Sequence, residues 1–368
     1  MSASARRSFG SDNNAPVAPE ILAAIVAANA GDAVGYGEDA WTAHAIDRLR
    51  EHFGAGTDVY FTFNGTGANV AALASLLRPW EAVLAPASAH LQTDECGALE
   101  RFSGSKVIPV ATSDGKLRAA DVEPYLKAGH DVHFPQPRAL SISQATEFGG
   151  VYELAELRQL CSFAHERGLF VHLDGARLSN AAVALGVMLR ETSVDAGVDV
   201  LTLGGTKNGL MLGEAICFFE PALHTQAAPF VQKQAMQLAS KMRYIAAQFE
   251  ALLTEDRWAR YAAHANAMAA RLHERVRDVP GVRVTRPVRC NAVFATLERE
   301  AIERIREQFF FYVFDEALPE ARWMTHWATT PQDVDDFADC VRAAAADPRR
   351  GNSRVPDSPR PSASGGRP

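Results

Sequence analysis

The sequence predicts an α/β protein with a mostly parallel sheet that is covered by helices on both faces. Between residues 16 and 213, short and almost continuously apolar runs alternate with helical segments. Strands of this composition are buried on both faces, which is typical of parallel sheets. After Phe219 the pattern changes to long helices with short strands between them, which indicates a smaller α/β unit. The predicted division is an N-terminal segment (1–14), a large domain (15–253) and a small C-terminal domain (254–346).

The elements follow from apolar runs and capping signals. Strands of the large domain are expected at 58–63, 83–84, 106–108, 140–142, 170–173 and 200–203. Pro19 opens a helical face over 21–26, Thr42 can cap a helix that ends at Gly54, and a further helix spans 153–167. After residue 219 we expect helices at about 230–253, 258–279, 299–307 and 332–345, and strands at about 293–297, 309–314 and 322–327.

Composition argues against several classes of protein. A net charge of −7 with dispersed signs argues against a nucleic-acid-binding surface. No apolar signal region follows the basic first residues, and no apolar stretch approaches the length of a membrane span. Five cysteines without Cys-x-x-Cys spacing favour reduced thiols in a cytoplasmic protein. We expect the Pro-, Ser-, Gly- and Arg-rich tail (347–368) to be disordered.

A lysine and an aspartate follow two of the predicted strands. Asp174 ends the apolar run at 169–173, and Lys207 follows the run at 198–203 within Gly-Gly-Thr-Lys-Asn-Gly. Ligands of such sheets bind beyond the carboxyl ends of the strands, so both side chains should meet in one site. Pyridoxal phosphate chemistry needs this pair, because a lysine holds the cofactor as a Schiff base and a carboxylate keeps the pyridine nitrogen protonated.

Other residues are expected to be structural. His172 and Asp174 share one face of a strand, which invites a metal site with His165, but no third ligand has suitable spacing, and we expect no metal. His172 is therefore expected in the core. Trp323 is expected in the core or at an interface, and the aromatic run at 309–312 is expected to be a buried strand, not a binding surface.

Several motifs occur in a fixed order along the chain: Ser11-Asp12-Asn13, Gly35-Tyr36-Gly37-Glu38-Asp39, Gly65-Thr66-Gly67-Ala68-Asn69, His90, Asp174-Gly175-Ala176-Arg177, Lys207, Met242-Arg243 and Arg322. Together they resemble the threonine aldolase family, within the aspartate-aminotransferase-like pyridoxal phosphate enzymes. Asp174-Gly175-Ala176-Arg177 is the most specific part of the resemblance. The resemblance implies the fold of those enzymes, in which a large domain with a mostly parallel sheet carries a small C-terminal α/β domain.

The resemblance also implies cofactor-binding residues. A helix that begins at Gly65 would bind the cofactor phosphate through backbone N–H groups and a hydroxyl. His90 matches a histidine that stacks on the pyridine ring, and Arg243 matches an arginine that can reach the phosphate across a subunit interface. The complete set is Gly65, Thr66, Gly67, His90, Asp174, Thr206, Lys207 and Arg243.

Four further matches concern the substrate. Arg177 and Arg322 match residues that hold the substrate carboxylate, which a planar guanidinium can bind bidentately. Ser11 and Tyr36 match positions near the substrate and the neighbouring subunit's site. One departure is Glu147, which stands where some family members have a histidine that contacts the substrate hydroxyl. The preference at the β-carbon therefore stays open.

The resemblance implies an aldolase that cleaves L-threonine, L-allo-threonine or related β-hydroxy-α-amino acids, such as phenylserine, reversibly to glycine and an aldehyde. Lys207 is the catalytic lysine, and either His90 or Glu147 takes the proton of the β-hydroxyl. The alternative is another pyridoxal phosphate reaction on the same fold, such as β-elimination or transamination. A homo-oligomer is expected, with a dimer as the minimum and a tetramer as the expected state.

Overall fold

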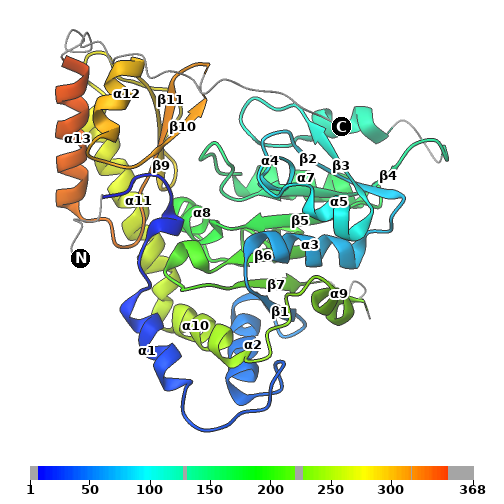
Figure 1. The fold of residues 1–368 in the computed structure, drawn as a ribbon. Helices are drawn as coiled ribbons and strands as arrows, with labels where there is room; N and C mark the ends of the chain where they lie inside the picture. Colours follow the sequence, from blue (N-terminus) through cyan, green and yellow to red (C-terminus); the bar gives the residue numbers. More distant parts are fainter. Residues whose placement is uncertain (1–6, 127–130, 220–226, 316, 347–368) are drawn as a thin grey trace, which may run out of the picture.

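The computed structural model describes residues 7–126, 131–219, 227–315 and 317–346, and two β-sheets organise the chain (Figure 1). The larger sheet has seven strands in the order β1-β7-β6-β5-β4-β2-β3. These strands are β1 (Asp58–Thr62), β2 (Glu81–Pro86), β3 (Lys106–Val110), β4 (Gln136–Ser143), β5 (Phe170–Gly175), β6 (Val200–Gly204) and β7 (Glu214–Phe218). The tail that is predicted to be disordered (347–368) lies outside the described residues.

The larger sheet is mostly parallel, which confirms the predicted fold class. The neighbours β3, β2, β4, β5 and β6 all pair in parallel, whereas β7 runs antiparallel to both β6 and β1. The sequence analysis does not assign β7, because an antiparallel neighbour needs no crossover helix to separate it from β6. Its first residue consequently lies at the same edge of the sheet as the carboxyl ends of the parallel strands.

Helices cover both faces of this sheet. Buried side chains of α3 (Gly65–Leu76), α5 (Ala98–Ser103) and α9 (Ala228–Gln234) pack on one face. The opposite face packs against α2 (Ala40–Phe53), α7 (Leu154–His165), α8 (Leu178–Leu185) and α10 (Arg243–Leu253). The remaining helices are α1 (Pro19–Ala27), α4 (His90–Thr93), α6 (Ala119–Val122), α11 (Arg257–Val276), α12 (Arg299–Arg306) and α13 (Pro331–Ala346). Within the described ranges, no helix has the length and apolar character needed to cross a membrane.

The smaller sheet is antiparallel, in the order β10-β11-β9-β8. Its strands are β8 (Arg283–Val284), β9 (Ala292–Thr296), β10 (Tyr312–Asp315) and β11 (Glu320–Met324). The N-terminal segment is fastened to it, because the ring of Phe9 stacks on Phe337 at 4.1 Å and the Met324 N–H donates to the Phe9 carbonyl at 2.7 Å. Helix α11 contacts α8 of the predicted large domain and α13 of the predicted small domain. Because it packs against both parts, the domain division at residue 253 stays a prediction.

Two helix predictions are wrong in detail. The helix expected at 230–253 is broken into α9 and α10, because Met236 takes a left-handed conformation with φ 61°. This break lets Gln237 accept a hydrogen bond from the N–H of Phe63 at 3.0 Å. The cap of α2 is Asp39 rather than Thr42, since Oδ1 of Asp39 accepts the Thr42 N–H at 2.8 Å.

The expected roles of the aromatic residues in the smaller sheet are partly confirmed. Trp323 is fully buried, as predicted. The aromatic run at 309–312 does not form one buried strand, because β10 begins only at Tyr312 and this residue is 47% exposed. His172 is buried, as predicted, with its ring nitrogens within hydrogen-bonding distance of the hydroxyls of Ser141 and Thr202.

Candidate active site

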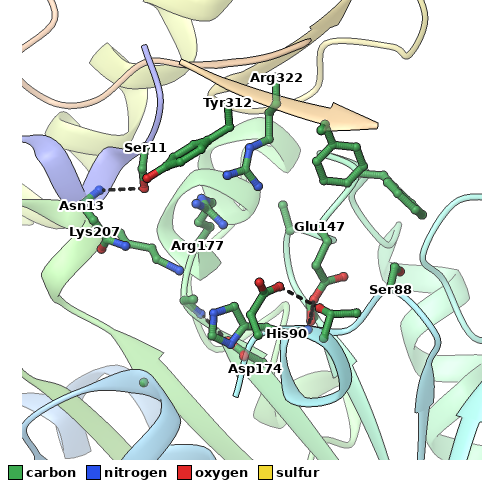
Figure 2. Close-up of a pocket in the computed structure, with 18 of the residues that line it drawn as sticks. Ser11, Asn13, Ser88, His90, Glu147, Asp174, Arg177, Lys207, Tyr312 and Arg322 are labelled. Carbon is green, nitrogen blue, oxygen red and sulfur yellow. Dashed lines mark hydrogen bonds between the residues drawn. The ribbon is translucent and has the colours of Figure 1, made fainter. Parts of the chain in front are cut away.

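Polar side chains gather where the strands of the larger sheet end, and they line a cavity of about 950 Å³ (Figure 2). This volume is typical of small-molecule sites. The cavity lies between the two sheets, with walls from the carboxyl-end loops of the larger sheet, from the N-terminal segment and from β10 and β11. Among its lining residues are Ser11, Gly65, Asn69, Ser88, His90, Glu95, Glu147, Asp174, Arg177, Lys207, Glu214, Tyr312 and Arg322.

Asp174 is held at the end of β5. In the sheet register it lies between Ser143 of β4 and Thr202 of β6. Its Oδ2 accepts a hydrogen bond from Asn69 of α3 at 3.0 Å, and its Oδ1 accepts the Ala176 N–H at 2.9 Å. Burial opposes ionisation, but the charge of Lys207 and these hydrogen bonds lower the pKa of Asp174. The cavity therefore contains an oriented, ionised carboxylate.

Lys207 lies in the short helix η4 (Thr206–Asn208), which directly follows β6. Its side chain points into the cavity, on the side where Arg177 and Asp174 also lie (Figure 2). Burial and the charge of Arg177 lower the pKa of the Lys207 amine. A lysine amine with a lowered pKa is a better nucleophile near neutral pH, which suits covalent attachment of a carbonyl group.

His90 begins α4 in the loop after β2, and Glu95 orients its ring. Nδ1 of His90 lies 2.8 Å from Oε1 of Glu95, whose side chain is fully buried. The same Glu95 oxygen accepts a hydrogen bond from Asn69 at 2.9 Å, so one amide group joins Glu95 to Asp174. The hydrogen bond with Glu95 raises the pKa of His90. A carboxylate at Nδ1 favours the tautomer that keeps Nε2 as the acceptor.

Glu147, the other candidate base, lies beside His90. Its Oε1 accepts hydrogen bonds from Oγ of Ser143 at 2.6 Å and from the backbone N–H of His90 at 3.1 Å. Its Oε2 is buried without a partner among the described residues. Burial raises the pKa of Glu147. Both candidate bases therefore belong to the same wall of the cavity.

Arg177 enters the cavity from the turn between β5 and α8, and Arg322 enters from β11 of the smaller sheet (Figure 2). Arg177 follows β5, and its Nε and Nη2 donate to the two carboxylate oxygens of Asp12 at 2.7 and 2.8 Å. Arg322 lies in β11, and its Nε is buried without a partner in the described part of the chain. Burial and the charge of Arg177 lower the pKa of Arg322. Two neighbouring guanidinium groups form a site for a carboxylate.

The first turn of α3 offers an anion site. Asn64 caps this 12-residue helix, and its Oδ1 accepts the N–H of Gly67 at 2.8 Å. The N–H groups of Gly65 and Thr66 have no acceptor among the described residues, and a Cβ placed on Gly65 would meet no atom within 4 Å. Free N–H groups at the positive end of a helix suit a phosphate. Gly67 instead packs closely against Gln237.

Five predicted residues are not among those that line the cavity of this one chain, namely Tyr36, Thr66, Gly67, Thr206 and Arg243. Tyr36 is 56% exposed, with Nζ of Lys233 4.8 Å from the centre of its ring. Arg243 donates from Nη1 to the carbonyl of Gly31 at 2.9 Å. The hydroxyl of Thr206, next to Lys207, accepts the Gly213 N–H at 3.1 Å.

The cavity is also lined by residues that were not predicted from the sequence, among them Asn69, Glu95, Glu214 and Tyr312. Glu214 is the buried first residue of β7, its Oε2 accepts the Gly205 N–H at 2.6 Å, and burial raises its pKa to about 7. Asn69 stands within a motif that the sequence analysis quotes, but nothing in the motif indicates that its amide links two carboxylates. For Tyr312 the prediction of a buried strand without a binding surface is wrong.

Residues 8–300 match the family of beta-eliminating lyases. The low specificity L-threonine aldolases of Pseudomonas aeruginosa and of a Pseudomonas species are 45% and 43% identical to this chain, over 91% of it and over 96% and 97% of their own lengths. The chain belongs to the low-specificity L-threonine aldolase family. The solved structure of Leishmania major threonine aldolase superposes on this family member with a TM-score of 0.86, at 32% identity over 92% of this chain and 99% of that one.

A more distant likeness concerns the fold alone. Aspartate aminotransferase from Thermus thermophilus is 16% identical and covers 92% of this chain and 90% of its own, with a TM-score of 0.68. This likeness and the two sheets confirm the predicted aspartate-aminotransferase-like fold.

The threonine aldolase family implies pyridoxal phosphate as the cofactor, and the residues of this cavity fit that group. Lys207 offers an amine for covalent attachment, Asp174 offers a carboxylate for a ring nitrogen, and the first turn of α3 offers N–H groups for a phosphate. Several lining residues also have buried polar atoms without a partner among the described residues, including Ser88 Oγ, Glu95 Oε2 and Arg322 Nε. Unpaired buried polar atoms are expected where a polar ligand binds.

Proposed function

We propose that this aldolase cleaves L-threonine, L-allo-threonine and related β-hydroxy-α-amino acids, such as phenylserine, reversibly to glycine and an aldehyde. The observation that carries the proposal is one cavity that holds Lys207 and Asp174 together with the two guanidinium groups of Arg177 and Arg322. The first pair suits the cofactor, and the second pair suits the carboxylate of an amino acid.

Each residue has a role in this proposal. Bound pyridoxal phosphate supplies an electron sink for the bond that breaks at the α-carbon. Lys207 attaches the cofactor covalently, and Asp174 holds a proton on its ring nitrogen. Arg322 and Arg177 hold the substrate carboxylate and so orient the α-carbon, which decides which of its bonds breaks. Ser11 lies beside the same carboxylate site, and Gly65 and Thr66 bind the phosphate.

His90 takes the proton of the β-hydroxyl in this proposal, directly or through a water. Its ring reaches the cavity and its Nδ1 is occupied by Glu95, which leaves Nε2 to accept a proton. Glu147 supports His90 by accepting its backbone N–H and stands where the family pattern has a histidine. Proton transfer of this kind contributes about a hundred- to ten-thousandfold to the rate.

The pH profile tests this assignment. A base must be unprotonated to act, so kcat/KM is expected to fall at low pH as His90 takes up a proton. The hydrogen bond with Glu95 raises the pKa of His90, so Glu95→Gln should lower this pKa and move the acid limb to lower pH. Glu147→Gln is the matched comparison, and it should leave an acid limb in place. An acid limb that disappears in Glu147→Gln and does not move in Glu95→Gln would assign the base to Glu147.

Aldehyde release tests the proposed function itself. Purified protein loaded with pyridoxal phosphate is offered L-threonine, L-allo-threonine and both β-phenylserine diastereomers, and glycine and aldehyde are expected in equal amounts. The ranking of the four substrates measures the preference at the β-carbon beside Glu147. Formation of a keto acid or ammonia without aldehyde would overturn the aldolase in favour of transamination or β-elimination.

The proposal includes a homo-oligomer, with a dimer as the minimum and a tetramer as the expected state. Tyr36 and Arg243 match family positions near an active site, yet in one chain they lie outside the cavity. Exposed apolar side chains near Tyr36, such as Met236 at 68% and Phe230 at 71% exposure, support a contact surface there. All five cysteines are free thiols, which supports a cytoplasmic location.

A further inference from the structure

Asp12 pairs with Arg177 beside the proposed substrate carboxylate site, and the proposed function gives it no role. It begins the 3-10 turn η1 (Asp12–Asn14), and its side chain is fully buried. The N-terminal segment places it there, since the same segment is hydrogen-bonded to β11 through Phe9 and Met324. A buried carboxylate beside two arginines that are to bind a second carboxylate requires an explanation.

Within the described part of the chain, the Asp12 carboxylate accepts hydrogen bonds from two side chains beyond its own turn. Both oxygens accept from Arg177, as a parallel pair at 2.7 and 2.8 Å, and Oδ2 also accepts from Nδ2 of Asn291 at 3.0 Å. Asn291 precedes β9 and donates from the same nitrogen to the carbonyl of Thr325 at 2.8 Å. The carboxylate thus connects the N-terminal segment, the loop after β5 and the smaller sheet.

The pairing changes what Arg177 can offer to a substrate. Its Nε and one edge of Nη2 are used by Asp12, and Nη2 also contacts the sulfur of Met324 at 3.5 Å. Only Nη1 has no partner among the described residues, whereas Arg322 has a free guanidinium edge with an unpaired Nε. The two arginines are therefore unequal, and Arg322 is the group that is free to bind a carboxylate bidentately.

The charges lead to the same conclusion. Two guanidinium groups that face one cavity repel each other, and the charge of Arg177 contributes to the lowered pKa of Arg322. Asp12 compensates one of these charges in the free enzyme. One net positive charge then remains for the single carboxylate of an amino acid.

We propose that Asp12 is a positioning residue, which clamps Arg177 in one orientation so that Nη1 alone guides the substrate carboxylate while Arg322 binds it. This inference rests on the proposed function of the cavity. It predicts that Asp12 affects the orientation of the α-carbon more than the affinity for the amino acid, because loss of Asp12 loosens Arg177 but also leaves more positive charge for the substrate.

The test begins with Asp12→Asn, which keeps the shape of the side chain and removes its charge. We expect kcat and kcat/KM to fall by the same factor, about tenfold or more, while KM stays nearly unchanged. This pattern indicates an interaction that acts in the transition state. Glycine binding, followed through the cofactor spectrum, should change little. Asn14→Ala, an exposed change in the same turn, is the control and should leave all values unchanged. A rise in KM at constant kcat would overturn the proposal.

A double-mutant cycle separates positioning from other roles. If Asp12 acts through Arg177, Asp12→Asn should cause no further loss of kcat/KM in an Arg177→Ala background. In that background the melting temperature should rise, because Arg177→Ala leaves Asp12 buried without a counter-charge and Asp12→Asn removes that charge. Additive losses of activity, or a further fall in melting temperature, would overturn the proposal.

A substitute variant and a wild-type assay ensure that each outcome can be interpreted. If Asp12→Asn does not fold, Arg177→Lys takes its place, since an ammonium keeps the charge but cannot form the parallel pair and should show the same fall in kcat at constant KM. Wild-type protein is assayed in parallel with the same amino acid. Absence of aldehyde from wild type would refute the proposed function, whereas active wild type with additive variants would refute only the role of Asp12.

Discussion

Lys207→Ala is expected to abolish both the absorbance of the covalently bound cofactor and multiple-turnover cleavage of β-hydroxy-α-amino acids. Lys207 follows β6 and reaches the cavity that also contains Asp174. In the proposed function its amine, whose pKa is lowered by burial and by the charge of Arg177, makes the covalent link and restores it after each turnover. The loss should exceed the roughly ten-thousandfold upper limit for removal of a general base.

Spectra and aldehyde release measured on the same preparation check this expectation. Lys106→Ala is the matched control, because Lys106 is exposed at the first residue of β3, at the opposite edge of the larger sheet. It should retain both signals. A Lys207→Ala protein that keeps the cofactor absorbance and turns over repeatedly would refute the assignment.

Arg322→Ala is expected to weaken amino-acid binding far more than cofactor binding. The Nε of Arg322 is buried without a partner among the described residues, and in the proposed function the substrate carboxylate supplies the counter-charge. Removing one partner of a buried, hydrogen-bonded charge pair costs about 2–5 kcal/mol, which corresponds to a rise of roughly 30- to several-thousandfold in KM. Binding of pyridoxal phosphate should change little, because the proposed phosphate site lies at Gly65.

Substrate titrations and cofactor titrations on one variant measure this difference directly. Arg283→Ala is a suitable control, since Arg283 is exposed on β8 at the edge of the same sheet. Equal losses of cofactor and amino-acid affinity in Arg322→Ala would indicate that Arg322 supports the fold rather than the substrate. A comparison with Arg177→Ala also tests the inequality of the two arginines, because Arg177 already has Asp12 as its partner.

The local pattern of the chain accounts for most of the fold. Apolar runs without polar alternation identify β1 to β6 as buried strands, and the carboxyl-end rule then places Asp174 and Lys207 together. The boundaries were less accurate where the partner of a residue is distant in sequence. The break between α9 and α10 depends on Gln237, which bonds to Phe63 across the fold, and helix periodicity does not record such a contact.

Some residues of the candidate site can also be predicted from the sequence, whereas the positions of others require the structure. Lys207, Asp174, His90, Arg177 and Arg322 follow from strand ends and from motifs in a fixed order, and all line one cavity. The cavity position of Tyr312 does not follow from its apolar run, because the side of a strand that faces a cavity depends on how the two sheets are arranged. The places of Tyr36 and Arg243 outside the cavity also require the three-dimensional structure.

By itself, the sequence determined the fold class, the cofactor and the candidate residues for its chemistry, because these depend on hydrophobic periodicity and on short motifs. The tertiary structure alone decided which charges compensate one another. Arg177 pairs with a carboxylate 165 positions earlier in the chain, and Asn69 joins Asp174 to Glu95. Such pairings depend on side-chain packing between distant segments, and a one-dimensional pattern contains no information about those distances.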